Sequence, residues 1–300
     1  MVSVIVCTYN REKYLGRCLQ HLADQRISPK AYEILIIDNK STDSTASIAE
    51  TFITDNEKLN TKYYLEQEQG HTFARNRGIK EAKGEILTFI DDDAFVRSDF
   101  IENIQTYFDT NHHVQAIGGK IVPVYEEEEP KWMSKYLLTL VSAIDLGDKP
   151  KEFKGNKFPI GANMSFREKV FQQYGSFNTE LGRRAGGLEG GDEKEMFLRL
   201  KKNNELIHYV PNVEVAHIIP EKRTQKEYIK GLGIGVGSSE MKRLKHSTIT
   251  EKLKKFLDEG IKIGGTFVLF FIYLFKGRFS AASMLVKFRL WVLKGLLKKA

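Results

Sequence analysis

The stretch EILTFIDDD, residues 85–93, places three carboxylates directly after a run of apolar, β-forming residues. Such a run predicts a buried strand. Adjacent carboxylates repel one another, and a hard divalent cation such as Mg²⁺ or Mn²⁺, which takes oxygen ligands, offsets that repulsion. The stretch therefore predicts either a metal site at a strand end or a solvated acidic loop that caps the following helix.

The segments around this stretch indicate how its strand fits into a sheet. Three more apolar runs predict strands: VSVIVCTY (2–9), YEILIIDN (32–39) and KYYLEQ (62–67). Helical patterns at 14–22, 41–54 and 73–83 separate these four runs, and this alternation predicts βαβ units in a mostly parallel sheet. Ligands of such sheets bind beyond the carboxyl ends of the strands. We therefore expect Thr8, Asn10 and Asp38 to lie with the aspartates at one edge.

A second acidic cluster opens a later helix. The stretch GGDEKEMFLRLKKN (190–203) has a helical pattern, and Asp192 and Glu193 stand in its first turn. Strands are expected on either side, at 158–166 and 206–212. Acids in a first turn are stabilised by the helix dipole, so simple capping explains them. The functional alternative is a general base, ionised and aimed at a hydroxyl group.

Composition sets outer limits on the protein class. The chain has 300 residues, of which 41% are hydrophobic and 28% charged, as in ordinary globular proteins with one large domain or two smaller ones. Two cysteines, Cys7 and Cys18, suit a reducing compartment and cannot build a disulfide framework. The opening MVSVIVCTYN has no basic region and no small-residue cleavage site, which argues against a secretory signal.

Charge is distributed unevenly along the chain. Residues 221–300 carry 18 Lys and Arg against 6 Asp and Glu, so the other 220 residues have a net charge of −5 within the total of +7. A mildly acidic body thus carries a basic C-terminal region. Such regions bind nucleic acid or anionic lipid, or are simply solvated.

Several motifs, taken in order, resemble those of family 2 glycosyltransferases with the GT-A fold: VSVIVCTYNR, EILIIDNKSTD, ARNRGI, FIDDDA, GANMSFR and GGDEKEMFLRL. The resemblance covers residues 1–220. It implies an α/β fold with a Rossmann-like, mixed and mostly parallel sheet flanked by helices. Residues 1–118 would form the nucleotide-binding half and 119–220 the acceptor half, followed by a helical, membrane-associating region at 221–300.

The resemblance also implies roles for the residues at the strand ends. The nucleotide contacts would come from Thr8, Asn10, Asp38 and Arg75, with Asp91 or Asp92 on the ribose. Asp93 would hold the Mn²⁺ or Mg²⁺ of the metal–diphosphate. His217 in VAHIIP either reaches the diphosphate or metal, as a histidine does in some GT-A enzymes, or packs at a strand end.

The acceptor side is implied less directly. The family usually has Glu followed by Asp in the acid pair, whereas this chain has Asp192 followed by Glu193. Aligning MFLRL puts Glu193 at the position of the base, with Asp192 as the alternative. Asn163 shapes the acceptor site or satisfies a turn. Trp132 stacks on an acceptor sugar or fills the core.

The expected activity is transfer of one sugar, with inversion, from a nucleotide-sugar to a hydroxyl of a saccharide or lipid-linked saccharide. UDP is the expected nucleotide and dTDP the alternative. The chain lacks the Q-x-x-R-W signature of the processive synthases at the corresponding positions, which favours one sugar per visit. A metal-dependent nucleotidyltransferase is a rival, but TYNREKYLG is a poor Gly-rich basic loop. Nucleic-acid binding is disfavoured because apolar and aromatic residues are not interleaved with basic ones.

The C-terminal region has the pattern of a membrane-surface helix. The run IGGTFVLFFIYLF (263–275) has 13 uncharged residues, and at ~1.5 Å per residue it is too short for a bilayer core of ~30 Å. The stretch MLVKFRLWVLKGLLKKA (284–300) is basic and amphipathic, which favours a peripheral position on an anionic membrane, at the cytoplasmic face of the plasma membrane. The alternative is packing on the catalytic domain or on another subunit. The run GLGIGVG (231–237) lacks nucleotide-loop spacing and is interpreted as flexible backbone.

Overall fold

The computed structural model describes residues 1–183, 190–245 and 247–297 of the chain. The chain forms two compact units. The first unit holds Met1–Val124, Ser142–Ala185 and Asp192–Ile218. The second unit holds Tyr125–Val141, Gly186–Gly191 and Ile219–Ala300.

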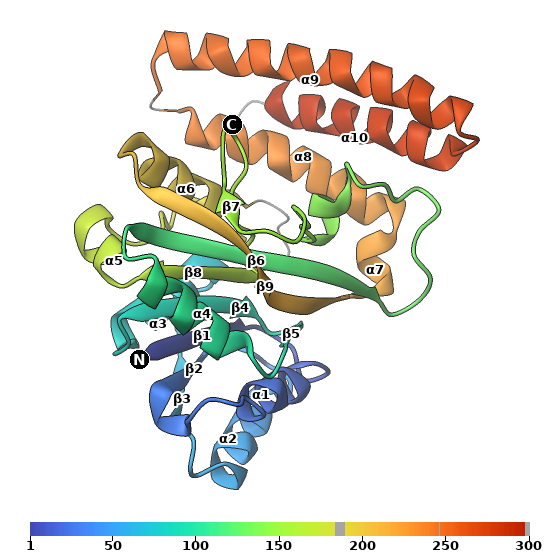
Figure 1. The fold of residues 1–300 in the computed structure, drawn as a ribbon. Coiled ribbons are helices and arrows are strands. Elements are labelled where there is room, and N and C mark those ends of the chain that lie inside the picture. Colours follow the sequence, from blue (N-terminus) through green and yellow to red (C-terminus); the bar gives the residue numbers. More distant parts are fainter. Residues whose placement is uncertain (184–189, 246, 298–300) are drawn as a thin grey trace. The chain divides into compact units, whose positions relative to one another are not determined.

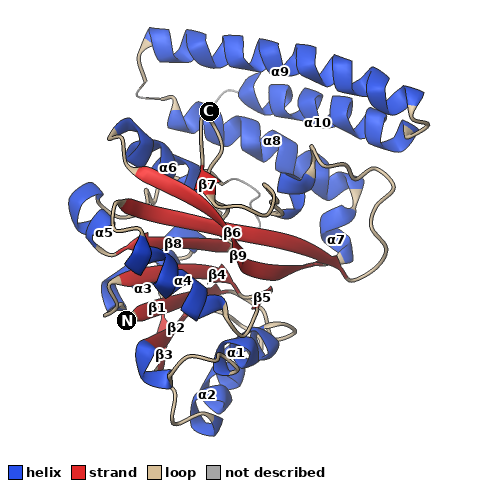
Figure 2. Ribbon diagram, in the orientation of Figure 1, coloured by secondary structure: helices blue, strands red, loops and turns tan. Residues whose placement is uncertain are grey.

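A nine-stranded sheet, counted over the described residues, forms the centre of the first unit (Figure 2). Its order is β3-β2-β1-β4-β8-β6-β9-β5, with β7 paired to β9. The strands are β1 (Val2–Thr8), β2 (Tyr32–Asp38), β3 (Thr61–Leu65), β4 (Ile86–Asp91), β5 (Ala94–Val96), β6 (Val114–Tyr125), β7 (Lys151–Glu152), β8 (Asn163–Arg167) and β9 (Leu206–Ile219). The β1–β2, β2–β3 and β1–β4 pairs are parallel, and β8 pairs antiparallel with β4 and β6.

Helices cover both faces of this sheet (Figure 1). They are α1 (Leu15–Ala23), α2 (Thr45–Asp55), α3 (His71–Glu81), α4 (Phe100–Thr110), α5 (Lys169–Tyr174) and α6 (Asp192–Lys202). Successive residues of a strand point to opposite faces, so β1 contributes to two cores. Val2, Val4 and Val6 pack with α1, α2 and α4, whereas Ile5 and Cys7 pack with α3, α5 and α6.

The predicted α/β architecture is confirmed: a mixed sheet, parallel through β3, β2, β1 and β4, is flanked by helices. All six predicted strands form, within a few residues of their expected bounds except at β9, which runs on to Ile219. Three strands were not expected: β5, the long β6 and the short β7. Of the six predicted strands, β8 was expected at 158–166 and begins at Asn163.

The second unit is helical over its C-terminal part, with α7 (Glu221–Thr224), α8 (Lys226–Arg243), α9 (Ile249–Phe275) and α10 (Phe279–Leu297). The prediction of flexible backbone at 231–237 is wrong, because these residues lie inside α8. Their glycines allow α8 and α10 to cross closely. A Cβ built on Gly237 would lie 2.2 Å from the carbonyl oxygen of Val292, and one on Gly295 would lie 2.1 Å from that of Ile234.

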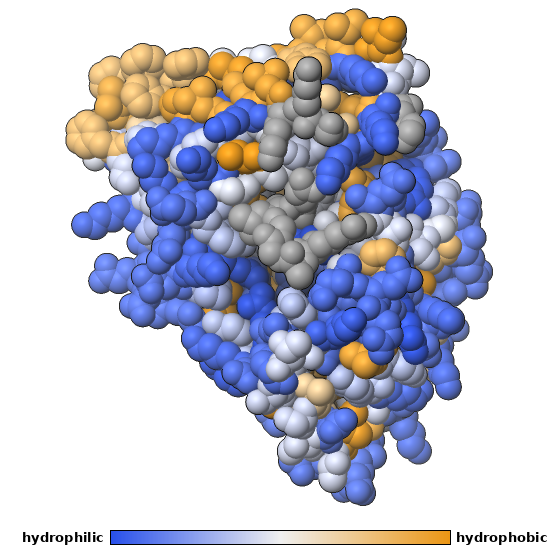
Figure 3. Space-filling view, turned by 180° about the vertical axis from the view of Figure 1, so that it is seen from behind, coloured by the Kyte–Doolittle hydropathy of each residue, from blue (hydrophilic) through white to orange (hydrophobic). Residues whose placement is uncertain are grey.

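Helix α9 is inverted relative to an ordinary amphipathic helix. Its buried face carries Glu259, whose carboxylate accepts hydrogen bonds from Lys262 and Arg289 at 2.7 and 3.0 Å and pairs with Lys255 at 3.0 Å. Its exposed face is apolar at positions three, four or seven residues apart: Ile249, Leu253, Leu257, Ile261, Val268, Phe271 and Phe275. Part of the apolar surface of the second unit appears as orange atoms in Figure 3. Among the described residues, no helix combines the length and apolarity that crossing a bilayer requires.

Candidate active site

The parallel register brings the carboxyl ends of three strands together. Thr8 at the end of β1 is level with Asp38 at the end of β2, and Cys7 is level with Asp91 at the end of β4. The expected gathering of Thr8, Asp38 and the first aspartate of the triplet at one edge is therefore present in the structure.

Asp38 is almost fully buried and is held from two sides. One carboxylate oxygen accepts a hydrogen bond from the Ser41 amide and the other from the Tyr63 hydroxyl, both at 2.8 Å. Burial and the Asp38 carboxylate raise the pKa of Tyr63. Asn10 adopts a left-handed φ of 53° and accepts a hydrogen bond from the Thr42 amide. The loops after β1 and β2 are thus tied into one wall.

Two residues of the aspartate triplet, Asp91 and Asp93, lie near His217. Asp91 and Asp93 form a group with His217 in which one ligand atom from each residue lies within 4.8 Å of the others. His217 arrives on β9, where it pairs with Ala94 of β5. Its Nε2 lies 3.0 Å from Asp93 Oδ1.

These three residues fit a divalent cation. Two carboxylates and one imidazole are ligands that Mn²⁺ accepts readily, and Mg²⁺ prefers the oxygens. Adjacent ligands of an octahedral ion with bonds of about 2.1 Å are about 3 Å apart, which matches the spacing between Asp93 and His217. Asp93 and His217 are both fully buried. The family resemblance implied Asp91 or Asp92 as the ribose contact, whereas the structure groups Asp91 with the candidate metal ligands.

Arg11 is a residue of this site that the sequence prediction did not include. Its guanidinium lies 3.2 Å from Asp92 Oδ1 and 3.5 Å from Asp93 Oδ2. Burial raises the pKa of Asp92 to about 7, although Arg11 opposes the shift. Arg11 directly follows the residues expected at the end of the first strand, so its position in TYNR was the available signal. It compensates the charge of the triplet.

The second acidic cluster opens α6, as predicted from the sequence. Asp192 is buried and Glu193 has a side chain 25% exposed. Arg75 of α3 donates Nη1 to Asp192 Oδ2 at 2.6 Å and Nη2 to Glu193 Oε1 at 2.7 Å. Arg75 therefore contacts the acid pair, a contact that the resemblance did not imply for it.

The electrostatic environment treats the two acids differently. Burial raises the pKa of Glu193, although Arg75 opposes the shift. Burial also acts to raise the pKa of Asp192, but the charges of Arg75 and His71, together with the hydrogen bond from Arg75, outweigh it and hold that pKa below its usual range. Burial lowers the pKa of the neighbouring His71 to about 4. The charge of Asp91 acts on both Glu193 and Arg75, so the acid pair and the triplet are within electrostatic reach of each other.

The two residues expected at the acceptor have structural partners within their own units. Asn163 is fully buried in β8, and its amide donates to the carbonyl oxygens of Val213 at 2.8 Å and Lys120 at 3.3 Å. It therefore ties β8 to β6 and β9 of the same sheet. Trp132 belongs to the second unit, where its indole N–H donates to the Thr224 carbonyl at 3.2 Å.

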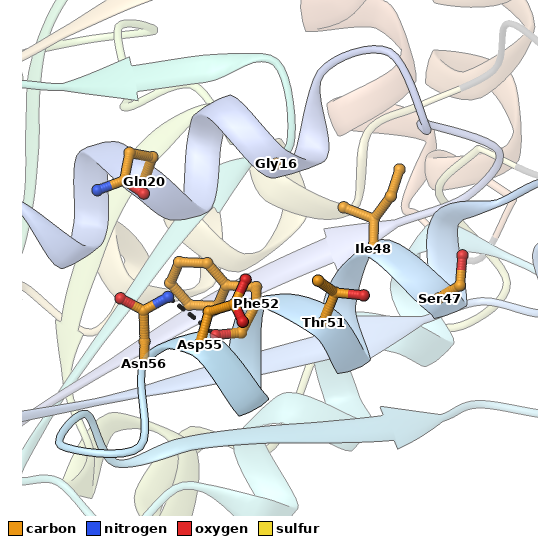
Figure 4. A pocket seen from close by; sticks show the side chains of 8 residues that line it. All are labelled: Gly16, Gln20, Ser47, Ile48, Thr51, Phe52, Asp55 and Asn56. Carbon is orange, nitrogen blue, oxygen red and sulfur yellow. Dashed lines mark hydrogen bonds between the residues drawn. The ribbon is translucent and has the colours of Figure 1, made fainter.

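A separate groove of about 500 Å³ lies between α1 and α2 (Figure 4). It is lined by Gly16, Gln20, Ser47, Ile48, Thr51, Phe52, Asp55 and Asn56. None of the predicted site residues is among them. This groove is therefore distinct from the strand-end site, which we define as Thr8, Asn10, Arg11, Asp38, Asp91, Asp92, Asp93 and His217.

A mixed sheet with buried acids at the carboxyl ends of its parallel strands, and an acid pair opening a later helix, defines an enzyme of the GT-A type. The model of the family described as "Glycosyl transferase family 2" matches residues 3–175. The chain therefore belongs to glycosyl transferase family 2 and is an enzyme that transfers sugars.

The known relatives agree on this class. The chain is 25% identical over 233 residues to a glucosyl-dolichyl phosphate glucuronosyltransferase of Haloferax volcanii, covering 76% of this chain and 72% of that protein. In fold it is similar to the mannosyltransferase PcManGT from Pyrobaculum calidifontis, in complex with GDP-Man and Mn²⁺, with a TM-score of 0.70, 17% identity and coverage of 100% of this chain and 88% of that chain. It is also similar to S. aureus TarS 1-349 in complex with UDP-GlcNAc, with a TM-score of 0.55, 21% identity and coverage of 78% and 66%.

Proposed function

We propose that the enzyme transfers one sugar, with inversion, from a UDP-linked donor to a hydroxyl of a saccharide or lipid-linked saccharide. The observation that carries the proposal is the pairing of two clusters in one unit: a metal-compatible group at Asp91, Asp93 and His217, and the acid pair at Asp192 and Glu193. The first suits a diphosphate and the second suits a hydroxyl.

The donor would lie along the ends of the parallel strands. Thr8, Asn10 and Asp38 would bind the nucleoside, and Asp92 would take the ribose. Asp93, His217 and Asp91 would hold Mn²⁺ or Mg²⁺, which supplies a Lewis acid for the departing diphosphate. A pyrimidine is proposed because the buried Asp38 carboxylate can accept from the N3–H of uracil or thymine. The N1–H of guanine offers a similar donor, so GDP is the nucleotide against which this choice is tested. The UDP-GlcNAc complex of TarS is consistent with this choice.

The acceptor hydroxyl would meet Glu193. The oxygen of the acceptor hydroxyl would form a bond to the anomeric carbon while the bond from that carbon to the diphosphate breaks. The proton of the acceptor hydroxyl would pass to the Glu193 carboxylate. One displacement inverts the anomeric centre and needs no enzyme nucleophile. We propose residues 1–220 as the catalytic domain, with nucleotide and acceptor halves divided near residue 118.

A lipid-linked acceptor is favoured by α9 and by the relatives. The Haloferax relative is named for a dolichyl phosphate substrate. Among the described residues of the second unit, nothing covers the apolar face of α9. Exposed basic side chains follow this helix at Lys276, Arg278, Lys287 and Lys294. Apolar surface beside lysine and arginine suits an anionic bilayer interface. We propose that the enzyme works as a peripheral protein on the cytoplasmic face of the plasma membrane.

A thermal-shift panel tests the donor proposal. UDP, dTDP and GDP are added to the full chain with and without Mn²⁺, because a ligand that binds the native state stabilises it by about 2.7 kcal/mol at 100 times its Kd. UDP with Mn²⁺ should raise Tm most. A rise that is independent of Mn²⁺, or larger for GDP, would contradict the proposed metal-bound UDP donor.

A further inference from the structure

Arg75 is among the largest fully buried side chains of the protein. A buried charge is costly unless it is paired and hydrogen-bonded, and Arg75 finds its partners 117 and 118 residues further along the chain. The guanidinium engages one oxygen of Asp192 and one oxygen of Glu193 with two different nitrogens. Because the guanidinium is planar and rigid, this contact fixes the position of one oxygen of each carboxylate relative to the other.

Two neighbours shape the space around this contact. Arg75 lies over the ring of Phe177, at 5.6 Å from its centroid. On another side stands Gly161, just before β8. A Cβ built on Gly161 would lie 2.0 Å from Glu193 Oε1 and 2.1 Å from Arg75 Nη2. As they are placed, Arg75 and Glu193 therefore occupy space that a side chain at position 161 would enter.

We propose that Arg75 is a positioning residue for the general base, and that Gly161 provides the space in which the two meet. In this arrangement Arg75 holds Glu193 through Oε1, and Oε2 takes the proton of the acceptor hydroxyl. The inference rests on the proposed function. It differs from the nucleotide contact that the family resemblance implies for Arg75, and the two roles predict different losses.

The charges that face Glu193 define what removal of Arg75 does. Arg75 comes from α3, Asp192 lies beside Glu193 on α6, and Asp91 comes from the end of β4. His71, also on α3, faces Asp192 and Arg75. Among the described residues, Arg75 supplies the positive charge that opposes these two acids at Glu193. Without it, Glu193 takes up a proton at higher pH, so the acid limb of the rate profile moves upward in pH.

The test uses three variants of the full chain and one matched control. Arg75→Gln removes the cation, Arg75→Lys keeps a charge that cannot bridge both acids, and Gly161→Ala displaces the pair. The control is Arg77→Gln on the same helix, where Arg77 pairs with Glu81 at the surface. Each variant is measured for kcat, donor KM, the pH profile of kcat, and UDP affinity by calorimetry with Mn²⁺.

A positioning role predicts loss of rate without loss of nucleotide. In Arg75→Gln, kcat should fall by about 10²-fold, as expected when a reacting group is misplaced by about 1 Å, and the UDP Kd should change less than about 3-fold. Arg75→Lys should recover part of the rate, Gly161→Ala should lose rate at unchanged UDP affinity, and Arg77→Gln should behave as wild type. A UDP Kd that weakens in step with the rate, or a kcat unchanged in Arg75→Gln, overturns the proposal.

A measurement without substrate separates this inference from the proposed reaction. The Arg75–Asp192 contact holds the pKa of Asp192 below its unfolded value of about 3.9. It therefore stabilises the native state at neutral pH, and that stability is lost as the pH falls through the lower native pKa. The stability deficit of Arg75→Gln against wild type should shrink on acidification. A deficit independent of pH contradicts the clamp, whereas the expected shrinkage with no transfer from any nucleotide-sugar contradicts only the reaction.

Discussion

Replacing the two acids of α6 one at a time should separate the base from its neighbour. In Glu193→Gln, the amide oxygen can still accept from Arg75 Nη2, so the contact of 2.7 Å survives while the basicity is lost. We expect transfer to fall by about 10²–10⁴-fold, which corresponds to about 3–5 kcal/mol in the barrier. The free energy of unfolding should change by only about 1 kcal/mol, the scale of a weakened hydrogen bond.

Asp192→Asn should show the opposite balance. Asp192 is the better buried of the two acids and makes the shorter contact, 2.6 Å to a guanidinium that is itself fully buried. Removing the charge leaves Arg75 with one anionic partner, and breaking a buried pair costs up to about 3–5 kcal/mol. We therefore expect a marked loss of stability, with a smaller loss of rate among the molecules that remain folded.

The assay combines denaturant unfolding with single-turnover transfer at saturating donor, so that rate and folded fraction are measured on the same samples. Glu193→Asp, which keeps the charge but shortens the side chain, controls for geometry. A larger rate loss in Asp192→Asn than in Glu193→Gln, at equal folded fraction, would refute the assignment and make Asp192 the base.

Three further predictions follow from other parts of the structure. Asp93→Ala should abolish the Mn²⁺-dependent part of the rise in Tm that UDP gives, whereas the control Asp99→Ala should keep that rise. If Asp93→Ala also keeps the rise, Asp93 is not part of the metal site. The double change Phe271→Glu and Phe275→Glu should release the full chain from anionic vesicles in sedimentation without lowering Tm, and unchanged pelleting would show that the apolar face of α9 is not the contact. Gly237→Leu should destabilise the protein by several kcal/mol, because its side chain would meet the backbone of α10; a change below about 0.5 kcal/mol would show that the helices can separate freely.

Local patterns predicted the part of the site that lies at strand ends and helix starts. Thr8, Asp38 and Asp91 follow buried apolar runs, and parallel pairing then leaves little choice about where they meet. The start of α6 at Asp192 follows from the glycines and acids that precede its apolar stripe. These features depend on residues only a few positions apart, which is the range over which a sequence pattern carries information.

Contacts between distant segments could not be predicted in this way. Arg75 contacts Asp192 and Glu193 only because α3 and α6 pack together in the folded unit. The residues around ARNRGI contain no pattern that predicts this contact. The same holds for Asn163, which sits in a strand that pairs antiparallel with β4 and β6. The glycines at 231–237 led to a wrong prediction of flexible backbone. Their low helix propensity is outweighed by the close packing of α8 against α10.

The parallel register of β1, β2 and β4 divides the connections of the first unit into two groups that should differ in tolerance to changes of length. The connections that leave the carboxyl ends, such as 9–14 and 39–44, carry or brace Asn10, Arg11 and Asp38, so one inserted residue would disturb the site directly. The connection that enters β3 from α2, at 56–60, lies at the opposite ends of the strands and holds no predicted site residue. Insertions and grafted tags should be accepted there, at a surface turn remote from the chemistry. The parallel sheet thus separates the strand ends at which the chain can change in length from the strand ends at which a change in length would move the site residues.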